Sequence, residues 1–392
     1  MRNILNPLRA RLLAGIVCAG AAMAAPAQET IKIGVVGPYT GPFASAGQSF
    51  KQGVESFLGI NGNKVGGRTV EVIYRDSGGA DPSLAKRLAE ELVVRDKVSI
   101  LAGFYLSPEV AAAAPVSAES KTPLLMPNAA TPALIRMSPY FVRLGITMSQ
   151  PAELAALHAR KAGKSRGYVA VADYGPGHLV EQAFMAKFTA EGGTMTGNVR
   201  IPLNTTDFSP FAERIANANP DVLQVFVPPG AAAVSFVKAL AARGLTGKLM
   251  IIGQGEADDS ELPQFDDAVL GYQSVINFDA YAENTQSKAM TAWLAKNVGP
   301  TARPNSLSIG TYDAMRVAYK MIADQAGKPF NGDAAMKAVS GYTFESPRGM
   351  VTLEPVRELT QDFYGREVVK GPDGVKRNRV IQKWEKVPPT AK

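Results

Sequence analysis

GFYLSPEVAAAAPVSAESKTPLLMPNAAT, residues 103–131, is the stretch of this sequence that decides its fold. It follows an apolar run at residues 98–102, which predicts a buried strand. A short polar turn with Ser107 leads into an alanine-rich segment suited to a helix, and a second apolar run at 124–126 ends in a tip of small residues. Strand, turn, helix and strand in this order predict one unit of a parallel α/β sheet.

The two turns of this stretch are candidate ligand contacts. In an open parallel sheet, the turns that follow the carboxyl ends of strands lie at one edge, which is where such folds bind their ligands. Hydroxyl groups and small residues in these turns leave backbone N–H groups open to an anionic ligand. Since most turns of this kind carry no function, the residues are equally compatible with ordinary loops.

The length and the amino terminus indicate an exported protein of two domains. A chain of 392 residues is longer than one hydrophobic core usually supports. Arginines precede an apolar segment at residues 12–25 that is too short to span a bilayer, and residues 25–27 read Ala-Pro-Ala. These features predict a signal peptide at residues 1–27. The single cysteine, Cys18, lies inside it, so the mature chain has no disulfide and no cysteine nucleophile.

The charge of the chain argues against a nucleic-acid partner. The formal charge is +7, and three of the positive charges are arginines of residues 1–27, which contain no acid, so subtracting three leaves +4. This charge is spread over a long chain without a basic run or a patch of interleaved aromatic residues. We therefore expect no nucleic-acid binding.

Two separate series of strands and helices predict two α/β lobes. The first series begins with a β-branched strand at 31–36 and ends at 131, and the second begins with a strand at 168–172 and a tight turn at 173–177. Three further segments lack this alternation and predict crossings between the lobes, the last with one short strand: 140–150, 272–278 and 341–353.

Catalytic signatures are absent from the sequence. There is no G-x-S-x-G elbow, no phosphate-binding P-loop and no G-x-G-x-x-G after a strand. His158 and His178 do not have the spacing of a zinc site, and a solvated loop explains the paired acids Asp258 and Asp259. The sequence therefore predicts a protein that is not an enzyme and that needs no cofactor or metal.

Several stretches, in order, resemble one family, the leucine/isoleucine/valine-type (branched-chain amino acid) solute-binding proteins of ABC transporters. They are IKIGVVGPYTGPFASAG at 31–47, VGGRTVEVIYRDSGGADPSLAKRLAEELVVRDKVSILAG at 65–103, ADYGPG at 172–177 and GYTFESPRGMVTLE at 341–354. The resemblance covers nearly the whole mature chain. It implies a type I periplasmic binding protein, with two doubly wound α/β lobes joined by three hinge crossings. The lobes implied are 28–147 plus 279–342 and 148–278 plus 343–392.

The resemblance also implies a function. The chain would be a periplasmic, monomeric component of an ABC importer that binds a branched-chain or other apolar amino acid between its lobes and delivers it to an inner-membrane permease. Ser107, Ala129 and Thr131 would hold the ligand's carboxylate, and Tyr174 would close over the ligand. The alternatives are that Tyr174 only packs in the wall between the lobes and that Thr131 only caps a helix begun by Pro132.

One departure from the family pattern concerns the other end of the ligand. Amino-acid binders place an acid after a strand of the second lobe, against the ligand's ammonium group. The corresponding loop here is GQGEADDSE, 253–261, and its acid, Glu256, falls about one place late. If Glu256 does not reach the cleft, the ligand lacks an α-amino group, because an unpaired buried ammonium is costly.

A set of aromatic residues near the first turns supports a second interpretation of the ligand. They either shape a pocket for a flat apolar group or only wall the first lobe. An aromatic or aliphatic carboxylate, or an amide, is therefore the alternative ligand. A sensor module that presents its ligand to a signalling receptor is the alternative of another class. The aromatic residues are Tyr39, Phe43, Phe104 and Tyr105.

Overall fold

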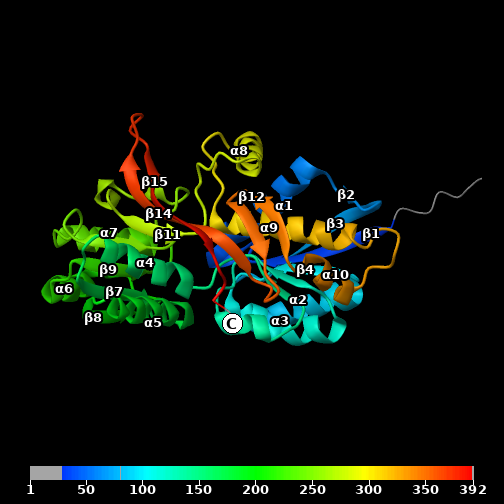
Figure 1. Cartoon of the computed structure of the whole chain (residues 1–392), viewed down its shortest axis with the longest axis horizontal. Coiled ribbons are helices and arrows are strands. Elements are labelled where there is room, and N and C mark those ends of the chain that lie inside the picture. Colours follow the sequence, from blue (N-terminus) through cyan, green and yellow to red (C-terminus); the bar gives the residue numbers. More distant parts are fainter. Residues whose placement is uncertain (1–28, 80, 391–392) are drawn as a thin grey trace, which may run out of the picture.

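The computed structural model describes residues 29–79 and 81–390, so the predicted signal peptide at 1–27 lies outside the described residues. The described chain forms two α/β lobes that lie next to each other along the long axis of the molecule (Figure 1). Within these ranges, no helix combines the length and the apolar character that a membrane crossing requires.

The first lobe is built on a six-stranded sheet with the strand order β2-β3-β1-β4-β5-β6. All neighbours in this sheet are parallel except β2 and β3. The predicted strand at 31–36 is confirmed, because its β-branched residues are buried in the centre of the sheet. The strands are β1 (Thr30–Gly37), β2 (Lys64–Val65), β3 (Arg68–Asp76), β4 (Ile100–Gly103), β5 (Leu124–Met126) and β6 (Phe141–Arg143).

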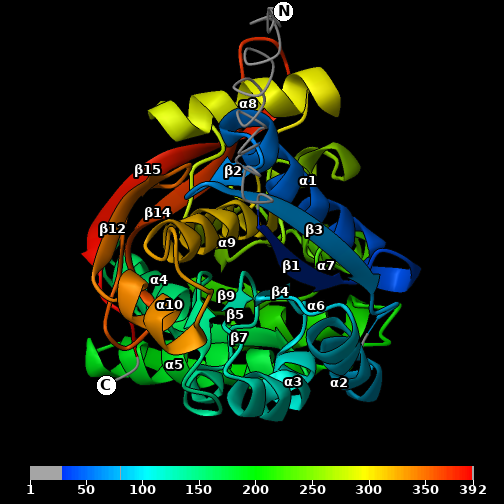
Figure 2. The ribbon, with the colours of Figure 1, turned by 90° about the vertical axis from the view of Figure 1, so that its right-hand side faces the viewer.

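Helices cover both faces of this sheet (Figure 2). α1 (Ala44–Asn61) and α9 (Ser306–Ala323) pack together on one face, and α2 (Pro82–Glu90) and α3 (Ser107–Ser120) pack together on the other. Asp81 caps α2, since its side chain accepts hydrogen bonds from the N–H groups of the first turn. α8 (Thr285–Asn297) and α10 (Gly332–Val339) complete the lobe, packed on α1 and α9.

The second lobe is built on a nine-stranded mixed sheet with the order β12-β13-β14-β11-β10-β9-β7-β8 and with β15 paired to β14. α4 and α5 pack together on one face, and α6 and α7 lie over the second apolar cluster on the other. The elements are α4 (Ser149–Lys161), β7 (Arg166–Ala172), α5 (Gly175–Ala190), β8 (Thr194–Ile201), α6 (Ser209–Ala218), β9 (Val222–Phe226), α7 (Ala231–Ala242), β10 (Met250–Gly253), β11 (Gln273–Ile276), β12 (Tyr342–Ser346), β13 (Gly349–Leu353), β14 (Leu359–Lys370) and β15 (Lys376–Val387).

Three sequence predictions need correction. The expected tight turn at 173–177 already contains the first turn of α5, where Pro176 is compatible with a helix start. The segment 140–150 holds only the short strand β6 before α4 begins. The segment 341–353 forms a hairpin of two strands, β12 and β13, rather than one strand. The causes are mostly local, since Pro176 suits the first turn of α5 and β12 pairs with β13, its neighbour in the sequence.

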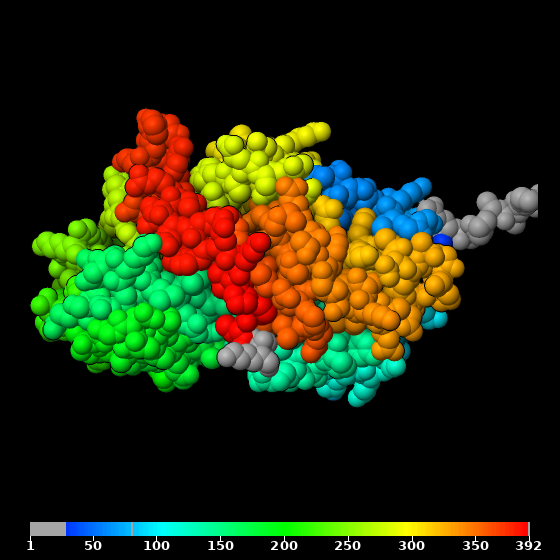
Figure 3. Space-filling model, in the orientation of Figure 1, coloured from blue at the N-terminus to red at the C-terminus, as the bar shows by residue number. Residues whose placement is uncertain are grey.

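The chain crosses between the lobes three times, after β6, after β11 and at the β12–β13 hairpin. On the face seen in Figure 3, the C-terminal strands cover the junction between the lobes. One side chain connects all three crossings, because Gln361 of β14 donates to the carbonyl of Gly145 (3.1 Å) and accepts from Asn277 (2.8 Å) and from Arg348 of the β12–β13 hairpin (3.0 Å). The lobe boundaries given by the resemblance stay a prediction.

Candidate ligand-binding cleft

A cavity of about 1220 Å³ lies between the two lobes. The first lobe contributes the turns after β4 and β5, the start of α1 and the loop before α9. The second lobe contributes the turns after β7, β9 and β10 and the turn of the β14–β15 hairpin. The carboxyl ends of parallel strands from both sheets therefore face one cavity, which is the position where open α/β sheets bind ligands.

The turn after β4 delivers Ser107 to the wall of this cavity. Gly103 has a φ of 95°, and a side chain at this position would meet the carbonyl oxygen of Val36 at 2.1 Å. The chain can therefore turn sharply here only with glycine. Ser107 is the first residue of α3, so it lies at the positive end of a helix of 14 residues.

Thr131 supports Ser107 from behind the cavity wall. Its hydroxyl group donates a hydrogen bond to the hydroxyl of Ser107 at 2.9 Å. Thr131 precedes the short 3-10 helix Pro132–Arg136, but its side chain makes no capping hydrogen bond there. Thr131 does occupy the N-cap position before Pro132, as the alternative interpretation predicted. That interpretation is wrong in one respect, because the Thr131 side chain does not cap the helix with a hydrogen bond.

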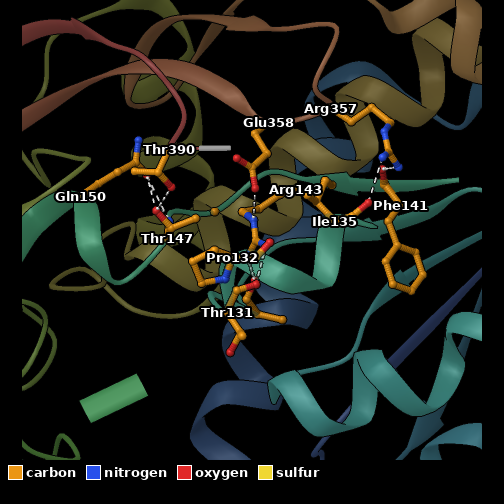
Figure 4. Close-up of polar contacts among 12 residues, drawn as sticks. Thr131, Pro132, Ile135, Phe141, Arg143, Thr147, Gln150, Arg357, Glu358 and Thr390 are labelled. Carbon is orange, nitrogen blue, oxygen red and sulfur yellow. Dashed lines mark hydrogen bonds and ion pairs between the residues drawn. The ribbon is translucent and has the colours of Figure 1, made fainter. Parts of the chain in front are cut away.

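A buried arginine holds the tip that contains Ala129 and Thr131 (Figure 4). The Arg143 guanidinium donates to the carbonyl oxygens of Ala129 and, at 2.7 Å, of Thr131. Its Nε lies 2.8 Å from Glu358 in the turn between β13 and β14, and both side chains are almost completely buried. Because Arg143 takes the carbonyl oxygens of the tip, the backbone N–H groups are what the tip offers to a ligand.

Aromatic side chains from both lobes line the cavity. Tyr105 belongs to the first lobe and packs on Phe43, with ring centroids 5.5 Å apart. Tyr174 of the second lobe is stacked on Phe226, with centroids 6.0 Å apart and an interplanar angle of 14°. Burial raises the pKa of Tyr174, and the nearby Tyr105 hydroxyl and Glu256 carboxylate add to this effect. Tyr105 and Tyr174 thus line the same cavity from different lobes.

The predicted site residues divide into two groups. Tyr105, Ser107, Ala129, Tyr174 and Glu256 line the cavity. The others lie behind its wall or in the core: Thr131 and Phe43 as described above, Tyr39 edge-on against Tyr74 (5.7 Å), and Phe104 fully buried in the apolar cluster under α2 and α3.

Glu256 lies in the cavity wall, but its carboxylate is used within the second lobe. The N–H groups of Gln254 (2.6 Å) and Val227 (3.3 Å) donate to its two oxygen atoms, and the Tyr272 hydroxyl lies 3.5 Å away. Only 3% of the residue is exposed. Burial raises the pKa of Glu256 to about 7, although the backbone hydrogen bonds oppose this effect.

The other four carboxylates in the wall also have partners within the described part of the chain. Burial raises the pKa of one of them, Asp258, to about 6, against the opposing effect of its guanidinium partner. All four are hydrogen-bonded, but only Asp258 and Asp373 have a cation as partner, because Asn378 and Gln264 are neutral amides that do not offset the charge of Asp259 and Glu261. The pairs are Asp258 with Arg366 (2.6 Å), Asp259 with Asn378 (3.0 Å), Glu261 with Gln264 (2.7 Å) and Asp373 with Arg377 (2.6 Å).

Some residues of the wall were not predicted from the sequence. Gln254, Phe226 and Asn277 line the cavity, as does the loop at 301–307 except for Pro304. Gln254 lies in the same loop as Glu256. Because it directly follows β10, at the carboxyl end of a parallel strand, its position could have indicated a ligand contact. Phe226 ends a predicted strand, but nothing local indicates that its ring stacks on Tyr174.

Two α/β lobes joined by three crossings, with a partly polar and partly aromatic cavity between them, define a bilobal binding protein for a small solute. Residues 30–373 match the family model described as "Periplasmic binding protein". The chain therefore belongs to the periplasmic binding protein family, and it is a solute-binding protein of the ABC-transporter kind with the type I fold. This is a family of transport proteins that bind solutes, not an enzyme family.

Three relatives illustrate the similarity of this chain to known proteins. The Leu/Ile/Val-binding protein homolog 6 of Brucella melitensis biotype 1 is 38% identical over 361 residues, covering 91% of this chain and 92% of the relative. The solute binding protein of an ABC transporter from Rhodopseudomonas palustris HaA2, solved in complex with p-hydroxybenzoic acid, is 39% identical, with a TM-score of 0.87 and coverage of 92% and 98%. Another from R. palustris BisB5, in complex with 3,4-dihydroxybenzoic acid, is 34% identical, with a TM-score of 0.85 and coverage of 92% and 99%. The family resemblance predicted from the sequence is confirmed.

Proposed function

We propose that this protein binds a small aromatic carboxylate of the hydroxybenzoate type and delivers it to an ABC permease. The observation that carries the proposal is the orientation of Glu256, whose carboxylate accepts two backbone hydrogen bonds inside the second lobe. An amino acid in the cleft would bring its ammonium group to a loop whose acid, Glu256, is already hydrogen-bonded within the second lobe, and an unpaired ammonium is costly in a buried site. The relatives in complex with hydroxybenzoic acids, at 39% and 34% identity, support the same ligand class.

In this proposal the ligand's carboxylate binds to the first lobe. The Ser107 hydroxyl and the N–H groups at the start of α3 and in the tip at 129–131 are its donors. Arg143 places positive charge directly behind the same tip. The aromatic ring then lies near Tyr105 and Tyr174, where offset or edge-to-face contacts between rings are favourable.

Residues outside the cavity wall act indirectly in this proposal. Thr131 orients the Ser107 hydroxyl, and Phe43 packs behind Tyr105. Tyr39 takes no part in ligand contact and stabilises the first lobe through Tyr74 and Asp76. Glu256 does lie in the cavity wall, but in this proposal it stabilises the second lobe rather than binding the ligand.

An apolar amino acid is the second candidate ligand. The relatives named as Leu/Ile/Val-binding protein homologs, at 38% identity, favour it. In that case an acid of the cleft would have to leave its present partner to reach the ammonium group.

A matched pair of ligands separates the two candidates. 4-Hydroxyphenylacetate and 4-hydroxyphenylglycine share a ring, a hydroxyl and a carboxylate, but only the second carries an α-amino group. Isothermal titration calorimetry should show saturable one-to-one binding of 4-hydroxybenzoate and 4-hydroxyphenylacetate, and little heat with 4-hydroxyphenylglycine or leucine. Tight binding of leucine together with no binding of the aromatic acids would contradict the proposal.

The cellular context belongs to the same proposal. We infer that the chain is exported to the periplasm, that the signal peptide is removed after Ala27, and that the mature protein acts as a monomer without turning over its ligand. Mass spectrometry of the exported protein and of the recovered ligand tests these points. A retained leader or a modified ligand would contradict them.

A further inference from the structure

A buried amide without a partner belongs to a residue in the second-lobe wall of the cleft. The Gln254 side chain lines the cavity and is only 2% exposed. Neither its Oε1 nor its Nε2 has a hydrogen-bond partner among the described residues. Its backbone is fixed, because the Gln254 N–H donates to Glu256 at 2.6 Å.

An unpaired buried amide is unusual enough to need an explanation. Buried polar side chains nearly always have partners, since leaving one unpaired is destabilising. Gln361, which is equally buried, uses both its oxygen and its nitrogen. Gln224, buried in the neighbouring strand β9, uses its nitrogen on a backbone carbonyl. Among these three glutamines, Gln254 alone has both amide atoms unpaired and also lines the cavity.

The two unpaired atoms indicate which kind of chemical group on a ligand could pair with them. Oε1 accepts a hydrogen bond and Nε2 donates one. A ligand ammonium group can only donate, which leaves Nε2 unpaired, and a second carboxylate can only accept, which leaves Oε1 unpaired. A hydroxyl group donates and accepts, so it satisfies both atoms.

We propose that Gln254 determines specificity by binding a hydroxyl group on the ring of the ligand, at the end away from the carboxylate. This inference rests on the proposed function, because the carboxylate is placed at Ser107 of the first lobe. The phenolic O–H donates to Oε1 and its oxygen accepts from Nε2. The ligand then connects the lobes, with its carboxylate in one and its hydroxyl in the other, and binding of the hydroxylated acid favours the closed arrangement.

The native protein provides the first test. Titration calorimetry compares 4-hydroxybenzoate with benzoate and with 4-methylbenzoate, whose methyl group occupies the place of the hydroxyl without hydrogen bonding. We expect 4-hydroxybenzoate to bind at least about tenfold more tightly than either analogue, which is the effect of about one well-formed hydrogen bond. Equal affinities for the three acids would overturn the role of Gln254 and leave the proposed function standing.

Gln254→Met is the matching variant, since methionine keeps the size of the side chain and removes both polar atoms. It should bring the affinities for 4-hydroxybenzoate and benzoate to within about threefold of each other, mainly by weakening 4-hydroxybenzoate. Gln224→Met, the same change at a buried position in the next strand but outside the cavity wall, is the control and should keep the native ratio. A native ratio in Gln254→Met would overturn the inference.

The result that overturns the proposed function is different. If the native protein binds none of the three acids, the ligand class is wrong and the inference falls with it. If it binds all three but does not distinguish them, only the inference fails.

Discussion

At the scale of single residues, Glu256 shows how burial changes the role of a side chain. The sequence places this acid in a loop at the cleft, and the family pattern suggests a partner for a ligand cation. In the folded protein its oxygens accept hydrogen bonds from Gln254 and Val227 instead. Because the carboxylate is desolvated, the pKa of Glu256 rises to about 7.

This raised pKa predicts how stability depends on pH. A carboxyl group whose pKa is higher in the folded than in the unfolded protein stabilises the fold fully below its ordinary value of 4.5, and this stability is lost as the pH rises through about 7. The native protein should therefore lose up to about 3 kcal/mol of unfolding free energy relative to Glu256→Gln over this pH range. Urea unfolding of both proteins without ligand, between pH 4.5 and 8, measures the difference.

The control for this prediction is Glu90→Gln on the exposed face of α2, where the Glu90 side chain is half exposed. The difference in unfolding free energy between this variant and the native protein should stay the same at every pH. A Glu256→Gln variant whose stability difference does not change with pH would show that the carboxylate is not desolvated in solution.

At the scale of elements, the tip that presents Ala129 and Thr131 depends on two other segments. Arg143 at the end of β6 donates to the carbonyl oxygens of the tip, and Glu358 in the turn between β13 and β14 pairs with Arg143. The candidate ligand-binding loop is thereby attached to a turn of the second sheet that lies 215 residues away from Arg143 in the sequence. The pair orients the loop and also connects it with that sheet.

From this arrangement we expect a double variant to recover stability without recovering ligand affinity. Glu358→Leu alone leaves a buried guanidinium unpaired and should cost about 3–5 kcal/mol of unfolding free energy. Arg143→Met combined with Glu358→Leu should recover most of this stability, because apolar side chains replace a buried ion pair well. The double variant should still bind 4-hydroxybenzoate at least about tenfold more weakly than the native protein, since the carbonyl oxygens of the tip have lost their donor.

Urea unfolding and titration calorimetry on the same preparations decide this point. Arg143→Lys keeps the charge but loses the forked donor geometry, so we expect it to bind with an intermediate affinity. Recovery of native affinity in the double variant would mean that the ion pair contributes only to stability.

At the scale of the whole molecule, the three crossings form one polar unit. Gln361 contacts Gly145 of the first crossing and Asn277 of the second, and Arg348 donates to Gln361 at 3.0 Å. Arg348 in turn pairs at 2.8 Å with Asp313 of α9 in the first lobe. Hinge movement of the lobes must therefore rearrange or rotate this unit as a whole.

We expect Gln361→Met to loosen the relative position of the lobes. The substitution leaves the partners of Gln361 unpaired, at about 1–3 kcal/mol for each buried group. Fluorescence labels at Lys86→Cys in α2 and Glu213→Cys in α6, two positions whose side chains are about half exposed, report the distance between the lobes. The distance distribution of Gln361→Met without ligand should be broader than that of the native protein, and 4-hydroxybenzoate should narrow both.

Gln325→Met is the matched control for the hinge. Gln325 is also buried and hydrogen-bonded, but its partners, Met321 and Asn331, belong to the first lobe alone. This variant should lose stability without broadening the distance distribution. Equal broadening in both variants would show that general destabilisation, not the hinge, causes the effect.

Local patterns predicted most elements of the fold because their causes are local. The β-branched run of β1, the spacing of Phe50, Val54 and Phe57 on α1, and the Asp81 cap of α2 each depend on neighbours within a few residues. β14 was missed because polar residues, Gln361 and Arg366, occupy buried positions on it, and its place was set by pairing with β11, β13 and β15.

The sequence by itself determined the order of most strands and helices and the loops at the carboxyl ends of the parallel strands, and so the turns of Ser107, Ala129 and Tyr174. Only the tertiary structure decided which residues line the cavity, because rotation about a few backbone bonds turns a loop residue inward or outward. It directed the Glu256 carboxylate to the N–H group of Val227, which is 29 residues away, and left the Gln254 amide unpaired in the wall of the cleft. Such contacts depend on how two sheets and three crossings pack together, and no local periodicity encodes that packing.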